Sequence, residues 1–270
     1  MLSGPLVPSS SIPPQPEMAE DWDVYFTSRP PPLRSILVDL GLRETAPDPA
    51  RGTLLRTRMA LLVPREDGLS DESETESLYA IEDALFQELG RGLGARYVGR
   101  CTRAGHREFF YYGKGAEGFP IALMSVQLQF PHYHFEAETE SDRDWNVYFE
   151  QLYPTELDLL SIQNRRVTEQ LSDLGDTLLE PRQVTHSMYF ASPHSREQFL
   201  KTIAAEGFGI SLKETEEPDA EYRYGVDLTR QDRVDLNSID GLVVDLYLRV
   251  VQAGGEYEGW DTYPLTGQST

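Results

Sequence analysis

The chain has 270 residues, of which 39% are hydrophobic, and this length and composition suit two packed domains and exclude wholesale disorder. It carries 45 acidic residues against 24 basic ones, a formal net charge of −21, which opposes contact with a phosphate backbone, so direct nucleic-acid binding is not expected. No stretch approaches the roughly 20 apolar residues of a membrane-spanning helix, so no membrane segment is expected.

Residues 1–20 are rich in proline and serine and lack the basic residues that open a signal peptide. We expect them to form a disordered tail. The single cysteine, Cys101, allows no intramolecular disulfide, which favours a reducing, cytoplasmic compartment. Its place in the apolar run 95–102 favours a buried structural thiol over a nucleophile.

In residues 21–153 the hydrophobic pattern alternates between the periods of strands and helices. The clearest helix opens with Ser73 and Glu76 as a capping signal and carries its leucines on one face. In chain order we expect a strand or turn at 21–26, strands at 34–40 and 54–63, a helix from 73 to 90, strands at 95–102 and 107–112, a helix at 119–130, a strand at 131–139 and a helix at 141–153.

Residues 154–270 show the same alternation, led by one additional helix. Thr155 and Asp158 form its capping signal, and Gly175 ends it. In chain order the pattern then predicts a strand at 183–190, a helix at 192–206, strands at 208–213 and 222–228, a helix at 235–253 and a strand at 256–264.

Both halves thus contain the order β-α-β-β-α-β, which is that of the ferredoxin-like split βαβ motif. We predict an α+β protein made of two tandem ferredoxin-like domains, at 21–153 and 154–270. Each domain is expected to be an antiparallel sheet with helices on one face.

The first half resembles a bacterial domain of unknown function. The resemblance rests on Trp22-x-x-Tyr25, Leu78-x-x-Ile81-Glu82-Asp83, Tyr97-Val98-Gly99 with Thr102, Arg107-Glu108-Phe109-x-Tyr111, Trp145-x-x-Tyr148 and Leu152-Tyr153-Pro154. It implies no known activity.

The second half resembles the regulator of ribonuclease E activity B, the RraB family. The resemblance rests on Leu174-Gly175-Asp176, His186, Gly207-Phe208 and the string Glu256-Tyr257-Glu258-Gly259-Trp260-Asp261-Thr262-Tyr263. Members of that family are acidic, ferredoxin-like proteins that bind ribonuclease E and restrain RNA decay. The resemblance therefore implies a non-catalytic regulator whose partner is ribonuclease E or another basic protein.

The segment Tyr257, Glu258, Gly259, Trp260 and Asp261 has two readings. Aromatic side chains flanked by carboxylates can anchor an interface. Alternatively, Gly259 only permits a tight bend while Trp260 covers the end of the sheet, and this structural reading is favoured by about two to one, since buried aromatics are mostly packing. A second candidate partner site is the acidic loop with Glu214, Glu216, Glu217 and Asp219, which is either a solvated loop or a surface for basic residues of a partner.

Metal and catalytic sites have weaker signals. His132 and His134 alternate in the expected strand at 131–139 and face the same side, with Glu136 next in line, but a metal site needs three or four ligands and a solvated strand face is more usual. His186 suits a satisfied core histidine better than a general base. The spacing Gly90-x-Gly92-x-Gly94 follows a helix instead of preceding one, so nucleotide binding there is rejected.

No cofactor is therefore expected, and the main hypothesis is a protein-binding regulator. Two alternatives remain open. A hydrolase predicts that His132, His134 and Glu136 meet in a deep pocket. A small-ligand sensor predicts an apolar cavity between the domains, lined by aromatic residues from Phe109 to Tyr112.

Overall fold

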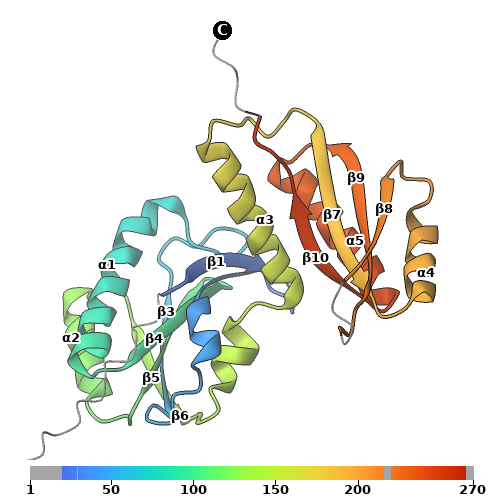
Figure 1. The fold of residues 1–270 in the computed structure, drawn as a ribbon. Coiled ribbons are helices and arrows are strands. Elements are labelled where there is room, and N and C mark those ends of the chain that lie inside the picture. The colour runs from blue at the N-terminus through green and yellow to red at the C-terminus, as the bar shows by residue number, and fades with distance from the viewer. Residues whose placement is uncertain (1–19, 29, 216–219, 266–270) are drawn as a thin grey trace, which may run out of the picture. The chain divides into compact units, whose positions relative to one another are not determined.

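The computed structural model describes residues 20–28, 30–215 and 220–265. The chain divides between Tyr153 and Pro154 into two compact units, each with its own sheet and core (Figure 1). Of the tail predicted at 1–20, all but residue 20 lies outside the described residues. The α+β class with two antiparallel sheets is confirmed.

The N-terminal unit is built on a six-stranded sheet in the order β1-β2-β4-β5-β3-β6, with every neighbouring pair antiparallel. The strands are β1 (Trp22–Thr27), β2 (Arg34–Asp39), β3 (Thr53–Ala60), β4 (Arg96–Arg103), β5 (His106–Gly113) and β6 (Phe135–Ser141). Within it, β3-α1-β4-β5-α2-β6 supplies the predicted β-α-β-β-α-β order, and β1 and β2 extend the sheet beside β4.

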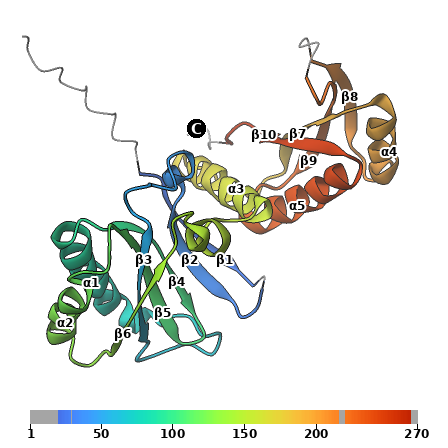
Figure 2. The ribbon, with the colours of Figure 1, turned by 90° about the horizontal axis from the view of Figure 1, so that it is seen from below.

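Two helices cover one face of this sheet. Helices α1 (Thr75–Leu85) and α2 (Phe119–Gln129) lie side by side in Figures 1 and 2, and α1 runs on into a π-helical turn at Phe86–Gly92. Their apolar faces close a core against Tyr97, Phe109 and other inward residues of β3, β4 and β5. The helices therefore form because burial of their apolar residues offsets the cost of ordering the chain.

The opposite face of the sheet is covered by the segment that follows β6. Trp145 stacks on Tyr112 with 4.1 Å between ring centroids, and its Nε1 donates to the backbone carbonyl of Arg51 at 2.8 Å. We predicted a helix opening at Ser141, and this is wrong, because Ser141 still belongs to β6. The helical turns begin after Trp145, where Asp142 accepts from the N–H groups of the residues at 146 and 147.

Strand β6 is an edge of the sheet and is strongly acidic. Its partner β3 places Arg58 opposite Glu136 and Arg56 opposite Glu138, and Arg56 forms an ion pair with Glu138. Glu140 follows on the same face of the strand, and all three glutamates are exposed. This face of β6 thus presents a row of negatively charged side chains to solvent.

The C-terminal unit has a four-stranded antiparallel sheet in the order β10-β7-β9-β8. Its strands are β7 (Arg182–Phe190), β8 (Gly209–Glu214), β9 (Tyr224–Asp232) and β10 (Gly255–Asp261), and its helices are α3 (Glu156–Asp173), α4 (Pro193–Ile203) and α5 (Leu236–Gln252). The order β7-α4-β8-β9-α5-β10 is again β-α-β-β-α-β, and the four strands are arranged in the same spatial order as β3, β4, β5 and β6. Helix α3 precedes this set and packs on α5.

The start of α3 carries the predicted capping box. The Thr155 side chain accepts from the Asp158 N–H, and the Asp158 carboxylate accepts from the Thr155 N–H at 3.1 Å. We expect Thr155→Ala to lower the free energy of unfolding of this unit by about 1 kcal/mol, because a helix N–H loses its partner. Urea unfolding followed by circular dichroism measures the change, and Thr155→Ser, which keeps the hydroxyl, should stay within about 0.5 kcal/mol of the wild type. Equal losses in both variants would contradict the capping role.

Candidate functional site

A β-bulge in β10 decides where the side chains of the predicted partner segment lie. Tyr257 pairs with Met188 and Gly259 pairs with Ser187, so Glu258 is an extra residue on β10. Gly259 has φ +149°, a conformation that L residues rarely adopt. An unbroken strand would send Tyr257 and Trp260 to opposite faces, but the bulge turns both toward the helices. In the sequence, the feature that marks this bulge is the step from Glu258 to Gly259, since glycine within a strand often accompanies a bulge.

Tyr257 is held inside the unit by a buried histidine. Its hydroxyl lies 2.8 Å from Nδ1 of His186, and the two side chains are buried. The ring of Phe208 meets the imidazole edge-on. Burial lowers the pKa of His186 to about 4, so the imidazole is neutral at physiological pH, and burial raises the pKa of Tyr257. His186 is thus a core histidine, but among the described residues only its Nδ1 has a hydrogen-bond partner, and its buried Nε2 has none.

Trp260 joins three elements through hydrogen bonds. Its Nε1 donates to Oδ1 of Asn164 on α3 at 2.8 Å, and the amide of Asn164 donates to Asp240 on α5 at 2.9 Å. The indole is half-buried against the core. Among the five predicted residues the exposed carboxylates are therefore Glu258 and Asp261, and both aromatic side chains face inward.

A hollow of about 520 Å³ opens beside β10, between α3, α5 and the strand. Its lining includes three glutamates and three tyrosines, namely Glu156, Glu256, Glu258, Tyr222, Tyr247 and Tyr257. The Tyr247 hydroxyl donates to the Glu156 carboxylate, which raises the pKa of Tyr247 to about 12. Sequence reasoning selected Glu258 but missed Glu156 and Tyr247, which are 91 positions apart and meet only through tertiary packing. We call this hollow the acidic hollow.

The other predicted site residues do not join the acidic hollow. Glu214 is exposed at the end of β8, while Glu216, Glu217 and Asp219 lie outside the described residues. His132 and His134 are exposed in the turn before β6, because that strand begins only at Phe135. Across the described parts of the chain, no three His, Cys, Asp or Glu side chains gather in a way that could hold a metal ion.

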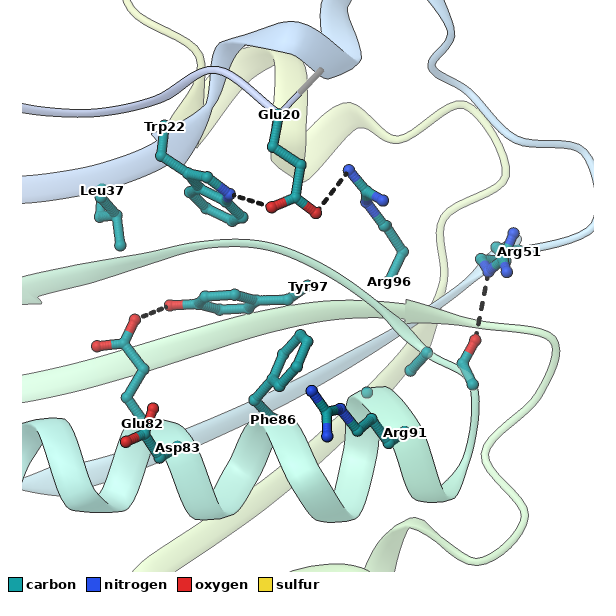
Figure 3. A pocket seen from close by; sticks show the side chains of 13 residues that line it. Glu20, Trp22, Leu37, Arg51, Glu82, Asp83, Phe86, Arg91, Arg96 and Tyr97 are labelled. Atoms are coloured by element: carbon teal, nitrogen blue, oxygen red, sulfur yellow. Dashed lines mark hydrogen bonds and ion pairs between the residues drawn. The ribbon is translucent and has the colours of Figure 1, made fainter. Parts of the chain in front are cut away.

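The N-terminal unit carries a separate groove of about 540 Å³ along α1, shown in Figure 3. Trp22 stacks on Tyr97 at 5.2 Å, and the Tyr97 hydroxyl donates to Glu82 at 2.6 Å. Glu20 accepts from the Trp22 indole at 3.0 Å and lies 3.7 Å from Arg96. The sequence did not connect these residues, since β1 and β4 are brought together only by β2 between them.

The aromatic run from Phe109 to Tyr112 forms packing, not a lining. All four rings are buried in the N-terminal unit, with Phe109 and Tyr111 under the helices and Tyr112 against Trp145 on the opposite face. The ligand-sensor alternative, which placed them around a cavity, is not supported by this arrangement. No helix among the described residues is long and apolar enough to cross a membrane.

The fold is thus that of a two-unit α+β protein with an acidic hollow in the second unit. Residues 161–262 match the family model described as Regulator of ribonuclease activity B (RraB), and residues 20–153 match a family of unknown function, DUF695. Both resemblances predicted from the sequence are confirmed. A crystal structure of an unknown protein from Galdieria sulphuraria aligns with 77% of this chain and 98% of its own at 7% identity, with a TM-score of 0.21, and supports no inference. No curated protein matches the chain.

Proposed function

We propose that the chain is a non-catalytic regulator that binds a basic protein through its C-terminal unit, with ribonuclease E as the first candidate partner. The observation that carries the proposal is the acidic hollow, most of whose lining lies within residues 161–262, which match the RraB family, while Glu156 comes just before them. Binding there would modulate RNA decay without any chemistry on this chain. The same proposal places this chain in the cytoplasm.

The acidic hollow suits a lysine or arginine side chain of the partner. Its three glutamates, at 156, 256 and 258, supply carboxylate acceptors, and Tyr222 and Tyr247 supply aromatic faces for a cation. Arginine at a partly desolvated pocket is a frequent hot-spot residue in protein interfaces. The hollow would therefore hold one basic anchor while the surrounding acids fix its orientation.

The charge of the whole chain supports a fast encounter with such a partner. A net charge of −21 attracts a basic surface over the distance of a Debye length, about 8 Å at physiological salt. This long-range term depends on total charge, whereas a basic side chain in the hollow depends on particular carboxylates. An experiment can therefore separate the two contributions by comparing variants that change the net charge equally at different places.

We expect Glu256→Lys combined with Glu258→Lys to weaken binding to purified ribonuclease E by at least about tenfold, because the partner cation meets two like charges. The matched control is Glu180→Lys combined with Glu197→Lys, two exposed acids of the same unit outside the hollow. It changes the net charge equally and should weaken binding by no more than about threefold. Titration calorimetry at 50 and 300 mM salt gives both affinities.

Equal losses of affinity in the two double variants would show that the hollow contributes only through the net charge of the chain. Absence of wild-type binding at low salt would overturn ribonuclease E as the partner. An RNA-cleavage assay with and without the chain then shows whether bound protein changes the activity of the ribonuclease.

A further inference from the structure

A second, smaller pocket lies in the N-terminal unit, beneath the first turn of α1. It has a volume of about 170 Å³. Hydroxyl and guanidinium groups dominate its lining, which includes Ser35, Ser70, Thr75, Tyr79, Arg100 and Arg107. None of the described residues that line it is acidic. We call it the arginine pocket.

The sheet register places Ser35, Thr102 and Arg107 in one row across β2, β4 and β5. Ser35 on β2 pairs with Thr102 on β4, and Thr102 pairs with Arg107 on β5. Arg107 is 5% exposed, lying on the same face of β5 as the core residue Phe109. Its Nε donates to Thr102 Oγ1 at 2.9 Å and its Nη2 to Ser70 Oγ at 3.3 Å. Both partners are neutral, so they orient the guanidinium without balancing its charge.

The acids near Arg107 are committed to other groups. Within the described residues no carboxylate comes within 4.0 Å of its guanidinium nitrogens. Glu74, which is buried, accepts from the N–H groups of Leu62 and Val63 at 2.9 and 3.1 Å. Glu82 forms an ion pair with Arg100 at 2.9 Å and accepts from Tyr97.

A buried guanidinium with neutral partners is costly unless an anion neutralises it. Burial lowers the pKa of Arg107 to about 10, which still leaves it charged at neutral pH. Arg100, which is paired with Glu82, adds a second guanidinium at the same pocket, and Thr75 adds a hydroxyl. Guanidinium groups together with serine and threonine hydroxyls are groups that bind tetrahedral oxyanions.

We propose that the arginine pocket binds a phosphoryl group, from inorganic phosphate or a small phosphate monoester. Arg107 contacts its oxygens from the floor of the pocket and Arg100 from the side. Ser35, Ser70 and Thr75 supply hydroxyl hydrogen bonds. Arg100 of the pocket forms an ion pair with Glu82, which lines the groove of Figure 3. An organic group on the phosphate would extend toward Trp22 and Tyr97.

The test uses the full chain and two probes, inorganic phosphate and adenosine monophosphate, at constant ionic strength with chloride as the reference anion. We expect saturable binding by calorimetry and a matching rise in the unfolding temperature, because a ligand that binds only the folded state stabilises it. Tighter binding of the monoester than of phosphate would place the organic group in the groove. Equal affinities would identify inorganic phosphate as the ligand class. An unsaturable response identical to that of chloride, for both probes, would overturn the proposal.

Arg107→Gln should weaken phosphate binding by about tenfold or more, since a charge-assisted hydrogen bond is lost. The matched control is Arg103→Gln, an arginine of β4 that is 42% exposed, pairs with Glu108 and lies outside the pocket. It should leave the affinity within about twofold. Ser70→Ala, a smaller change that is expected to fold, should weaken binding about threefold. Circular dichroism checks that each variant is folded. Unchanged affinity in Ser70→Ala together with equal affinities in the two arginine variants would overturn the assignment.

Discussion

Replacing Asp176 with alanine is expected to lower the free energy of unfolding of the C-terminal unit by about 3–5 kcal/mol. Asp176 forms an ion pair with Arg182, and both side chains have no exposed surface. Its carboxylate also accepts from the N–H groups of Leu178 at 2.8 Å and Leu265 at 2.7 Å. Removing it leaves a buried guanidinium without its counter-charge, which costs far more than the pair itself contributes.

Chemical unfolding of the full chain, followed by circular dichroism and tryptophan fluorescence, measures this loss. The control Asp173→Ala removes an exposed acid at the end of α3 and should change the free energy by less than about 0.5 kcal/mol. The double variant Asp176→Ala, Arg182→Met should recover much of the loss, because the unpaired charge is gone. A loss below 1 kcal/mol in the single variant would show that water reaches Arg182.

Acid should destabilise the C-terminal unit between pH 6.5 and about 4 through His186. The folded unit holds this imidazole neutral with a pKa of about 4, whereas the unfolded chain has the ordinary value of 6.5. In that window the unfolded state binds more protons, so the free energy of unfolding falls as the pH falls. At about 1.4 kcal/mol for each pKa unit, the total loss is about 3 kcal/mol.

Urea unfolding at several pH values between 7.5 and 4.5 tests this dependence. The double variant His186→Phe, Tyr257→Phe removes the imidazole and the phenol that faces it. Its free energy of unfolding should therefore lose about 3 kcal/mol less than that of the wild type across this window. His194→Gln changes an exposed histidine of α4 and should keep the wild-type slope. The ion pair with Arg182 holds the pKa of Asp176 well below its usual 3.8, so its contribution is lost only below this window. Identical slopes in the wild type and the double variant would refute the role of His186.

The helices and the element order could be predicted because they depend on local patterns. The apolar face of 235–253, for example, matches α5 at Leu236–Gln252, and Thr155 begins α3 as expected. The prediction of a helix at 141–153, after β6, failed for a physical reason. Trp145 adopts φ 56°, a left-handed conformation that its stacking on Tyr112 and its bond to Arg51 hold in place. No local pattern signals such a tertiary constraint.

The candidate sites depend on contacts between distant parts of the chain, and most of them could not be predicted. The string at 257–261 was recognised, but the bulge at Glu258 decides which of its side chains are available to a partner. The acidic hollow needs Glu156 and Tyr247, whose contact comes from the packing of α3 on α5. From the sequence, Arg107 cannot be told from an ordinary polar residue of a strand, because only the strand register shows that it lies beside Thr102.

The row of exposed glutamates on β6 has a consequence for the chain at high concentration. An edge strand with free backbone groups is a template on which a second molecule can add its own strand and begin to aggregate. If two copies met along β6, Glu136, Glu138 and Glu140 of one would face the same acids of the other, and like charges in opposed positions disfavour pairing. Within its own sheet the same row is favourable, since Arg56 and Arg58 on β3 lie opposite two of these acids. The edge therefore completes the native sheet and discourages its extension by another molecule.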